Sequence, residues 1–311
     1  MKAGTLVKSA LVVGVLLYTR VAPAQSTGFA IDRFEPAERG SDFFVNESLD
    51  LRGKLRPAVG VVVDWAYQPL VLYERGNVRG SSQGDVLTDQ IFVHAGGALV
   101  LADRFRVAAN LPLAIYQHGE EIAPVALGVH RQSGAGVGDL RLSGDARVLG
   151  TYGQEFTAAV GFQLHLPTGS RDALTSDGTV RLAPRVLLAG ELEWFLYAAK
   201  GGFAYRPFEG TFEGNKLGSE FIFSAAVGVK VSKRFTFGPE FYGSTVVVGG
   251  DGAFRRRNTP LEILFGAHVT LADQWQAGLA IGPGLTRGDG SPKMRVLFSV
   301  ELAPDVDEKA Q

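Results

Sequence analysis

The chain repeats one pattern along most of its length: stretches in which every second residue is apolar, separated by short polar turns with an aromatic residue just after them. Between Phe105 and Ile115, for example, the alternate residues are all apolar, whereas the residues between them are mostly small, polar or charged. A turn of this kind recurs roughly every forty residues, and the aromatic residues that follow it are Phe156, Phe195, Phe235 and Trp275. Alternation with period two is typical of β-strands, so the sequence predicts an all-β protein.

Three β architectures produce repeats of this kind. A propeller has four short strands in each repeat of about forty residues, whereas each repeat here contains two long ones. A soluble sandwich or lipocalin-like barrel uses strands of about five or six residues, whereas these runs exceed the roughly 9–11 residues that a tilted strand needs to cross a bilayer. Turns alternate between short and long, and aromatic residues mark the strand ends, as in membrane barrels. We therefore expect a transmembrane antiparallel up-and-down β-barrel with short periplasmic turns and longer external loops.

The alternation divides this barrel into about twelve strands. An even number of strands returns the chain to the side of the membrane on which it started. The predicted strands are 58–73, 87–101, 104–118, 137–149, 155–168, 178–190, 194–206, 218–231, 235–248, 259–271, 275–287 and 292–302.

The two ends of the chain lack the alternation. Residues 1–24 begin with a basic region, continue with an apolar run that is too short to cross a bilayer, and end in Ala22-Pro23-Ala24, which is the pattern of a cleaved signal peptide. Residues 25–57 are charged, and they either stay in the periplasm or enter the lumen. We expect the outer-membrane barrel at 58–303 and a charged tail at 304–311, with both termini in the periplasm.

Composition argues against several functional classes. The formal net charge is −1, so the chain lacks the strongly basic surface of a nucleic-acid-binding protein. There is no cysteine, which excludes disulfide bonds and cysteine-ligated metal sites. The chain has no phosphate-binding loop, zinc-protease motif or nucleophile elbow, so we expect no enzyme, no metal and no cofactor. An enzyme at the barrel rim remains a remote alternative, because it needs a serine and a histidine within hydrogen-bond reach there.

The polar face of the predicted strands gives the lumen both signs of charge. Such residues either pair with one another and stiffen a narrow barrel, or line a water-filled pore. The candidate lumen-lining residues are Asp64, Arg106, Arg141, Asp145, Arg147, Arg181, Arg185, Lys200, Arg206, Glu220, Lys230, Glu240, Glu262, Arg295 and Glu301. Among them, we expect three arginines, at 181, 185 and 206, to face the glutamates at 220, 240 and 262. The residues expected to form an aromatic girdle at the membrane interface are Phe105, Phe156, Trp194, Phe195, Phe235 and Trp275.

Several stretches together resemble one family. The lead-in "RFEPAERGSDFF" and the runs "FVHAGGALVLADRFRVAANLPLAIYQHG" and "LPTGSRDALTSDGTVRLAPR" are similar to the N-terminal barrel of large OmpA-family outer-membrane proteins. The resemblance covers about residues 28–303, and it implies a structural role that anchors the cell envelope. In that family a downstream domain binds peptidoglycan, whereas this chain ends in "APDVDEKAQ".

The expected partners are outer-membrane lipid, the barrel-assembly machinery and, through a downstream domain only, peptidoglycan, but not nucleic acid. A small-solute diffusion channel is the alternative function. An outer-membrane rim enzyme is the remote one.

Overall fold

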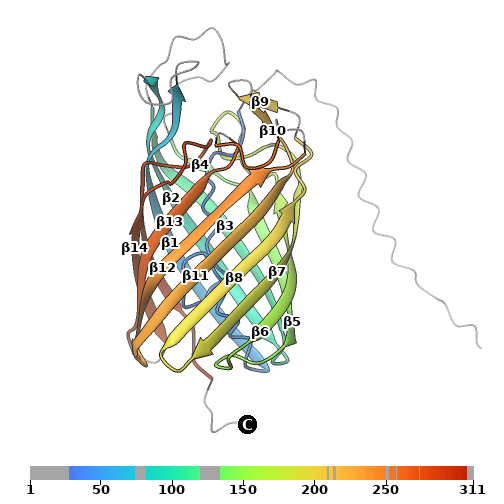
Figure 1. Cartoon of the computed structure of the whole chain (residues 1–311), viewed down its shortest axis with the longest axis vertical. Helices are drawn as coiled ribbons and strands as arrows, with labels where there is room; N and C mark the ends of the chain where they lie inside the picture. Colours follow the sequence, from blue (N-terminus) through green and yellow to red (C-terminus); the bar gives the residue numbers. More distant parts are fainter. Residues whose placement is uncertain are drawn as a thin grey trace, which may run out of the picture.

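The fold is a closed antiparallel β-barrel of twelve long strands, as predicted (Figure 1). It comes from a computed structural model, which describes residues 28–73, 82–119, 134–208, 210–212, 215–248, 252–256, 258–272 and 274–306. No helix in these ranges is long and apolar enough to cross a membrane.

Each long strand pairs with its neighbours along the chain, and the first strand also pairs with the last one, which closes the barrel. The long strands are β1 (Leu55–Tyr73), β2 (Ser82–Leu101), β3 (Phe105–His118), β5 (Leu140–Leu149), β6 (Thr157–Leu166), β7 (Arg181–Leu192), β8 (Phe195–Ala204), β11 (Glu220–Ser232), β12 (Phe235–Val246), β13 (Leu261–Thr270), β14 (Trp275–Gly282) and β15 (Met294–Leu302). A short strand, β4 (Gly136–Val137), pairs with β3. A separate hairpin is formed by β9 (Gly210–Phe212) and β10 (Asn215–Leu217).

Strand ends differ from the predicted ones by a few residues in most places. Two differences reach five residues: β2 was expected to begin at residue 87 but begins at Ser82, and β14 was expected to run to residue 287 but ends at Gly282. Pro283 follows, and a proline has no N–H group to donate to a neighbouring strand. The apolar alternation continues beyond this point in the sequence, so the alternation alone does not locate the end of the strand.

The outside of the barrel is apolar. On three adjacent strands, Phe265, Leu279 and Phe298 are 57%, 60% and 48% exposed, whereas their chain neighbours Leu264 and Leu297 are fully buried. Successive residues of a strand point to opposite faces, so one face of each strand is turned outward and the other inward. An outward face of large apolar side chains suits lipid and not water.

The two ends of the barrel have different connections. At one end, here called the short-turn end, the turns are tight, and Ala102, Asp103, Glu193 and Ala272 have positive φ angles between 51° and 62°. At the other end, here called the long-loop end, longer connections join the strands, among them the loop between β6 and β7 (Figure 1).

Residues 28–54, here called the luminal segment, lie inside the barrel and run along its whole length (Figure 1). At the long-loop end, the Gly28 carbonyl accepts a hydrogen bond of 2.9 Å from Arg171. At the short-turn end, the Gly53 N–H donates to Asp103 at 2.6 Å. Arg56 contacts the Pro304 carbonyl at 3.3 Å, so the described chain finishes at the short-turn end. The expected signal peptide and both termini lie outside the described residues.

The core of the barrel forms between the luminal segment and the inward faces of the strands. Phe34 and Phe44 of the segment cluster with Tyr242, Leu264 and Leu297 of the wall, and all five are at most 5% exposed. The barrel interior is therefore filled by a packed segment.

Candidate functional site

The lumen is the candidate site because it gathers the charged side chains named from the sequence. Buried in it are Asp64, Arg106, Arg141, Asp145, Arg185, Arg206, Glu220, Glu240, Glu262, Arg295 and Glu301. Half-buried side chains are those of Arg147, Arg181, Lys200 and Lys230. Many of these groups contact the luminal segment.

At the long-loop end, Asp177 of the β6–β7 loop holds the start of the segment. Its carboxylate accepts a hydrogen bond of 3.0 Å from the Ala30 N–H and one of 2.6 Å from the Arg206 Nε. Burial alone would raise the pKa of the Asp177 carboxyl, but the guanidiniums of Arg206 and Arg181 and the hydrogen bond from Ala30 together hold this pKa well below its usual range. The loop therefore presents a fixed negative charge to the segment.

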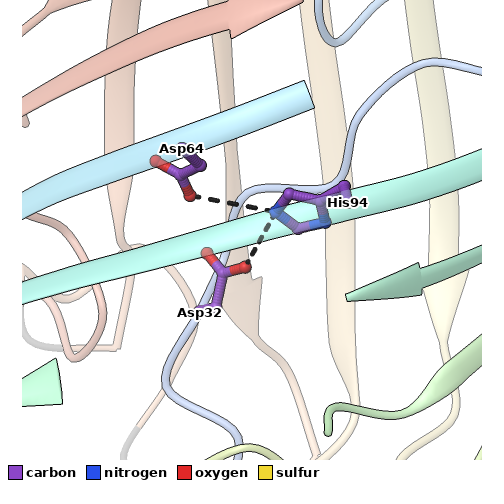
Figure 2. Close-up of side chains that lie close together, drawn as sticks. All are labelled: Asp32, Asp64 and His94. Carbon is purple, nitrogen blue, oxygen red and sulfur yellow. Dashed lines mark ion pairs between the residues drawn. The ribbon is translucent and has the colours of Figure 1, made fainter. Parts of the chain in front are cut away.

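Further along the segment, Asp32 approaches two residues of the wall, as Figure 2 shows. The His94 Nε2 of β2 lies 3.6 Å from an Asp32 oxygen and 4.0 Å from an Asp64 oxygen on β1. Arg295 of β15 contacts both carboxylates, and it also donates to Glu262 of β13 at 2.8 Å.

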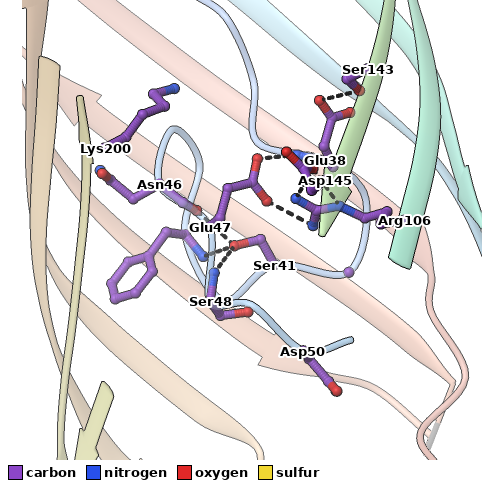
Figure 3. A network of polar contacts seen from close by, with 12 residues as sticks. Glu38, Ser41, Asn46, Glu47, Ser48, Asp50, Arg106, Ser143, Asp145 and Lys200 are labelled. Atoms are coloured by element: carbon purple, nitrogen blue, oxygen red, sulfur yellow. Dashed lines mark hydrogen bonds and ion pairs between the residues drawn. The ribbon is translucent and has the colours of Figure 1, made fainter. Parts of the chain in front are cut away.

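In the half of the lumen nearer the short-turn end, two glutamates of the segment join a network of wall charges, drawn in Figure 3. The Arg106 guanidinium lies 2.8 Å from Glu47 and 2.7 Å from Asp145. Glu38 accepts a hydrogen bond of 2.8 Å from the Ser143 hydroxyl. Because these carboxylates are almost fully buried, each depends on its cationic and hydroxyl partners for stability.

On the opposite wall, Glu240 of β12 binds the backbone of the segment. Its carboxylate accepts hydrogen bonds from the N–H groups of Phe44, Val45 and Asn46 at 2.6, 2.9 and 3.1 Å, and from the Asn46 side chain at 3.1 Å. Successive N–H groups that point to one side form an anion-binding concavity. Glu240 is 1% exposed, and these contacts supply the partners that its burial requires.

Near the short-turn end, two more contacts fix the segment. Glu301 of β15 accepts hydrogen bonds from Arg39 at 3.3 Å and from the Gly40 N–H at 2.8 Å. Asp50 then accepts from Arg56 at 3.1 Å. The segment is thus held by charged groups at intervals along its whole length.

One expectation about pairing is wrong in most of its parts. Of the expected arginine–glutamate pairs, Arg206 and Glu220 form one, at 3.0 Å, but they lie at adjoining ends of the neighbouring strands β8 and β11 and not across the lumen. Arg181 pairs with Asp139 and Asp177, Arg185 with Asp145 and Glu38, and Glu262 with Arg295. The physical reason is that the luminal segment occupies the centre, so facing walls meet the segment instead of each other.

The segment's own charged residues are the part of the site that the alternation did not identify. They include Asp32, Arg33, Glu38, Arg39 and Glu47. The available signal was a charged stretch with aromatic pairs and without period two, which fits an irregular chain in contact with a polar wall.

The aromatic residues named as a girdle lie at the short-turn end of the barrel. Phe105, Phe156, Trp194, Phe235 and Trp275 are 48%, 47%, 59%, 38% and 48% exposed, and Phe195 is half-buried. Each follows a short turn, where a strand begins or is about to begin.

A cavity remains between the segment and the wall, in the half nearer the long-loop end. Its volume is about 50 Å³, and it is lined in part by Phe34, Phe92, His94, Pro112 and Arg141. A cavity that holds benzene measures about 150 Å³. In the arrangement described, this cavity has room for water but not for an aromatic molecule.

Comparison with known proteins bears on what such a barrel does. Residues 78–289 match the model of a family described as "Putative MetA-pathway of phenol degradation". A search of the curated proteins found no match.

Solved structures share the architecture. An outer membrane channel from Pseudomonas putida F1 aligns with a TM-score of 0.55 and 16% identity, over 80% of this chain and 95% of that one. The NanC porin aligns with a TM-score of 0.51 and 7% identity, over 80% of this chain and all 100% of the porin. At these identities the likeness concerns the fold, which, with the apolar exterior, supports an outer-membrane location.

The family match corrects the resemblance to the OmpA family and the anchoring role inferred from it. The stretches behind that resemblance combine a charged lead-in with alternating strands, and any lipid-embedded barrel with a polar interior requires the same alternation. The expected peptidoglycan partner rested on this resemblance alone.

Proposed function

This chain belongs to the family described as "Putative MetA-pathway of phenol degradation", and from that premise we propose that it is an outer-membrane channel for small aromatic solutes such as phenols. The family match carries the proposal. In it, the long-loop end faces the outside and the short-turn end faces the periplasm. Export by a signal peptide at residues 1–24 and insertion by the barrel-assembly machinery are parts of the same proposal. We propose no enzymatic step.

Passage in this proposal requires the luminal segment to move. A cavity of about 50 Å³ beside Phe34 and Phe92 lies between the segment and the wall. A phenol there would meet the aromatic rings of Phe34 and Phe92 and the polar groups of His94 and Arg141. Such a mixed lining suits a molecule with an apolar ring and one hydroxyl group.

A second candidate function is the diffusion of small hydrophilic solutes. The observation that favours it is the charge of the wall, where carboxylates and guanidiniums alternate around the segment. Both functions use the same lumen, so they differ in the solute that crosses and not in the path.

Uptake by cells distinguishes the two functions. We would express the chain in a bacterium whose cytoplasm contains a phenol-oxidising enzyme and measure phenol consumption at low phenol concentration, with glycerol uptake measured in parallel. Faster phenol consumption with unchanged glycerol uptake is the expected result. Faster glycerol uptake alone would replace the proposal with the second candidate, and no change in either would remove both.

A further inference from the structure

Three potential metal ligands meet inside the barrel, each from a different element. Asp32 belongs to the luminal segment, Asp64 to β1 and His94 to β2, and Figure 2 shows their polar groups turned toward one another. One ligand atom from each lies within 4.8 Å of the other two. The His94 Nε2 is 3.6 Å from Asp32 and 4.0 Å from Asp64.

Two of these buried side chains have polar atoms without hydrogen-bond partners among the described residues. His94 is 2% exposed, and among the described residues neither of its ring nitrogens has a hydrogen-bond partner. Asp64 is 1% exposed, and its Oδ1 also has none within that part of the chain. Unpartnered polar atoms in such positions are costly, so their presence needs an explanation.

Arg295 orients the two carboxylates. It contacts Oδ2 of Asp64 and lies 3.4 Å from Oδ1 of Asp32. In Asp32, the oxygen nearest to His94 is Oδ2, which Arg295 leaves free. In Asp64, the oxygen nearest to His94 is Oδ2, which Arg295 also contacts, and Oδ1 is left for a further partner. Residues that fix the ligands of a metal in this way are typical of metal sites.

The local charge balance is negative. Arg295 is in contact with three carboxylates, those of Asp32, Asp64 and Glu262. The neighbouring guanidiniums of Arg39 and Arg141 pair with Glu301 and Glu38, and Arg39 also donates to the His94 carbonyl at 2.8 Å. When ionised, the three carboxylates exceed the one guanidinium by two charges, which a divalent cation would neutralise.

We propose that Asp32, Asp64 and His94 form a binding site for a divalent transition-metal ion, with Zn²⁺ as the ion to test first. A mixed set of imidazole and carboxylate ligands suits such ions. Zinc bonds of 2.0–2.2 Å separate tetrahedral ligands by about 3.4 Å, so small shifts of the side chains from 3.6 and 4.0 Å complete the site. The adjoining cavity of about 50 Å³, lined by Asp32 and His94, has room for a water molecule as the fourth ligand.

The site would join the luminal segment to β1 and β2. The site adjoins the cavity of the proposed solute path, but Zn²⁺ binding needs no solute, so its test is independent of the test of the proposed function. Its expected consequence is that bound Zn²⁺ raises the unfolding temperature of the protein, because the ion binds only when the segment is seated.

The test uses the full mature chain, folded in detergent and freed of metal with a chelator. Titration with ZnCl₂ by calorimetry is expected to show one site per chain, and Co²⁺ at the same site is expected to give a visible absorption spectrum. Asp32→Asn and His94→Gln should each weaken Zn²⁺ binding by at least about tenfold. Asp32 lies on the segment, so its substitution leaves the barrel wall intact.

The matched control is His268→Gln. His268 is also buried in the lumen and both of its ring nitrogens lack partners among the described residues, but it packs against Phe44 and not against carboxylates. This variant should bind Zn²⁺ like the unaltered protein. Absence of binding, or equal binding by Asp32→Asn and the unaltered protein, would overturn the proposal. The excess negative charge around Arg295 would then be balanced by protons on the carboxyl groups.

Discussion

Glu240 shows how a single residue holds the luminal segment. Its four hydrogen bonds reach three successive residues of a chain that has no regular structure of its own. Hydrogen bonds to a charged group are worth about 1.5–3 kcal/mol each, and more is lost when a buried partner is left unsatisfied.

Replacing this carboxylate with an amide should release the segment. In Glu240→Gln, the amide N–H₂ group would face backbone N–H donors, so part of the contact is lost. We expect a lower unfolding temperature and a higher ion conductance in planar lipid bilayers. Glu191→Gln is the control, because Glu191 pairs with Lys230 of the wall and has no hydrogen bond or ion pair with the segment among the described residues. If conductance and unfolding temperature both stay at the unaltered values, Glu240 does not retain the segment.

A single substitution can also test whether the outward face of a strand meets lipid. Phe265 lies in the middle of β13 and is 57% exposed. Phe265→Arg would place a charge in the centre of the lipid, at a cost of about 2–4 kcal/mol. Leu271, 52% exposed, follows the same strand at the short-turn end, where the same substitution should cost about 0–1 kcal/mol. Unfolding by urea in lipid vesicles measures both free energies, and equal costs would mean that the apolar band has been placed at the wrong depth.

At the scale of elements, the sequence predicts the strands of the barrel well but does not predict the position of the luminal segment. Strands repeat with period two, because one face meets lipid and the other the lumen, so their number and the inward face of residues such as Glu240 and Glu262 follow from local sequence. The segment has no period. Its position depends on which of its charges meet which wall charges, as for Glu47 and Arg106, and these contacts join residues far apart in the chain. For this reason the sequence left its location open.

Locking the segment to the wall should stop transport. A Cβ built on Gly40 would lie 3.8 Å from the Cβ of Ala58 on β1, which is the usual separation in a disulfide. The chain has no cysteine of its own, so the double variant Gly40→Cys/Ala58→Cys can form only this bond. We expect phenol uptake to fall on oxidation and to recover on reduction.

Gly40 has a φ of 89°, so the new side chain costs some stability in both redox states. The single variant Ala58→Cys, treated with the same oxidant, controls for effects on the cells. Equal uptake by the oxidised and reduced double variant would show that solutes pass without movement of this part of the segment.

At the scale of the whole molecule, the barrel has no free edge among its long strands, since β1 pairs with β2 on one side and β15 on the other. Every strand is therefore held from both sides, and unfolding requires many hydrogen bonds to break together.

Closure predicts heat-modifiable migration on gels. The folded chain should keep its compact form in detergent at room temperature and should migrate differently after boiling, which unfolds it. Circular dichroism before boiling should show β-structure. Identical migration before and after boiling, with a helical spectrum, would contradict a closed barrel.

Val59 of β1 pairs with Leu302 of β15, so the barrel can close only after the last strand has been made. Residues 28–54 precede both in the chain and end up enclosed by them. Their charged groups contact β3, β5, β11 and β15, and the backbone N–H of Phe44 contacts β12. Because one short stretch binds strands from around the whole circumference, it can serve as an internal template on which those strands gather before the seam closes. In this order of events, the start of the chain is enclosed as the barrel forms and does not have to be threaded through a finished barrel. A mature protein without these residues would have to assemble its strands without these contacts.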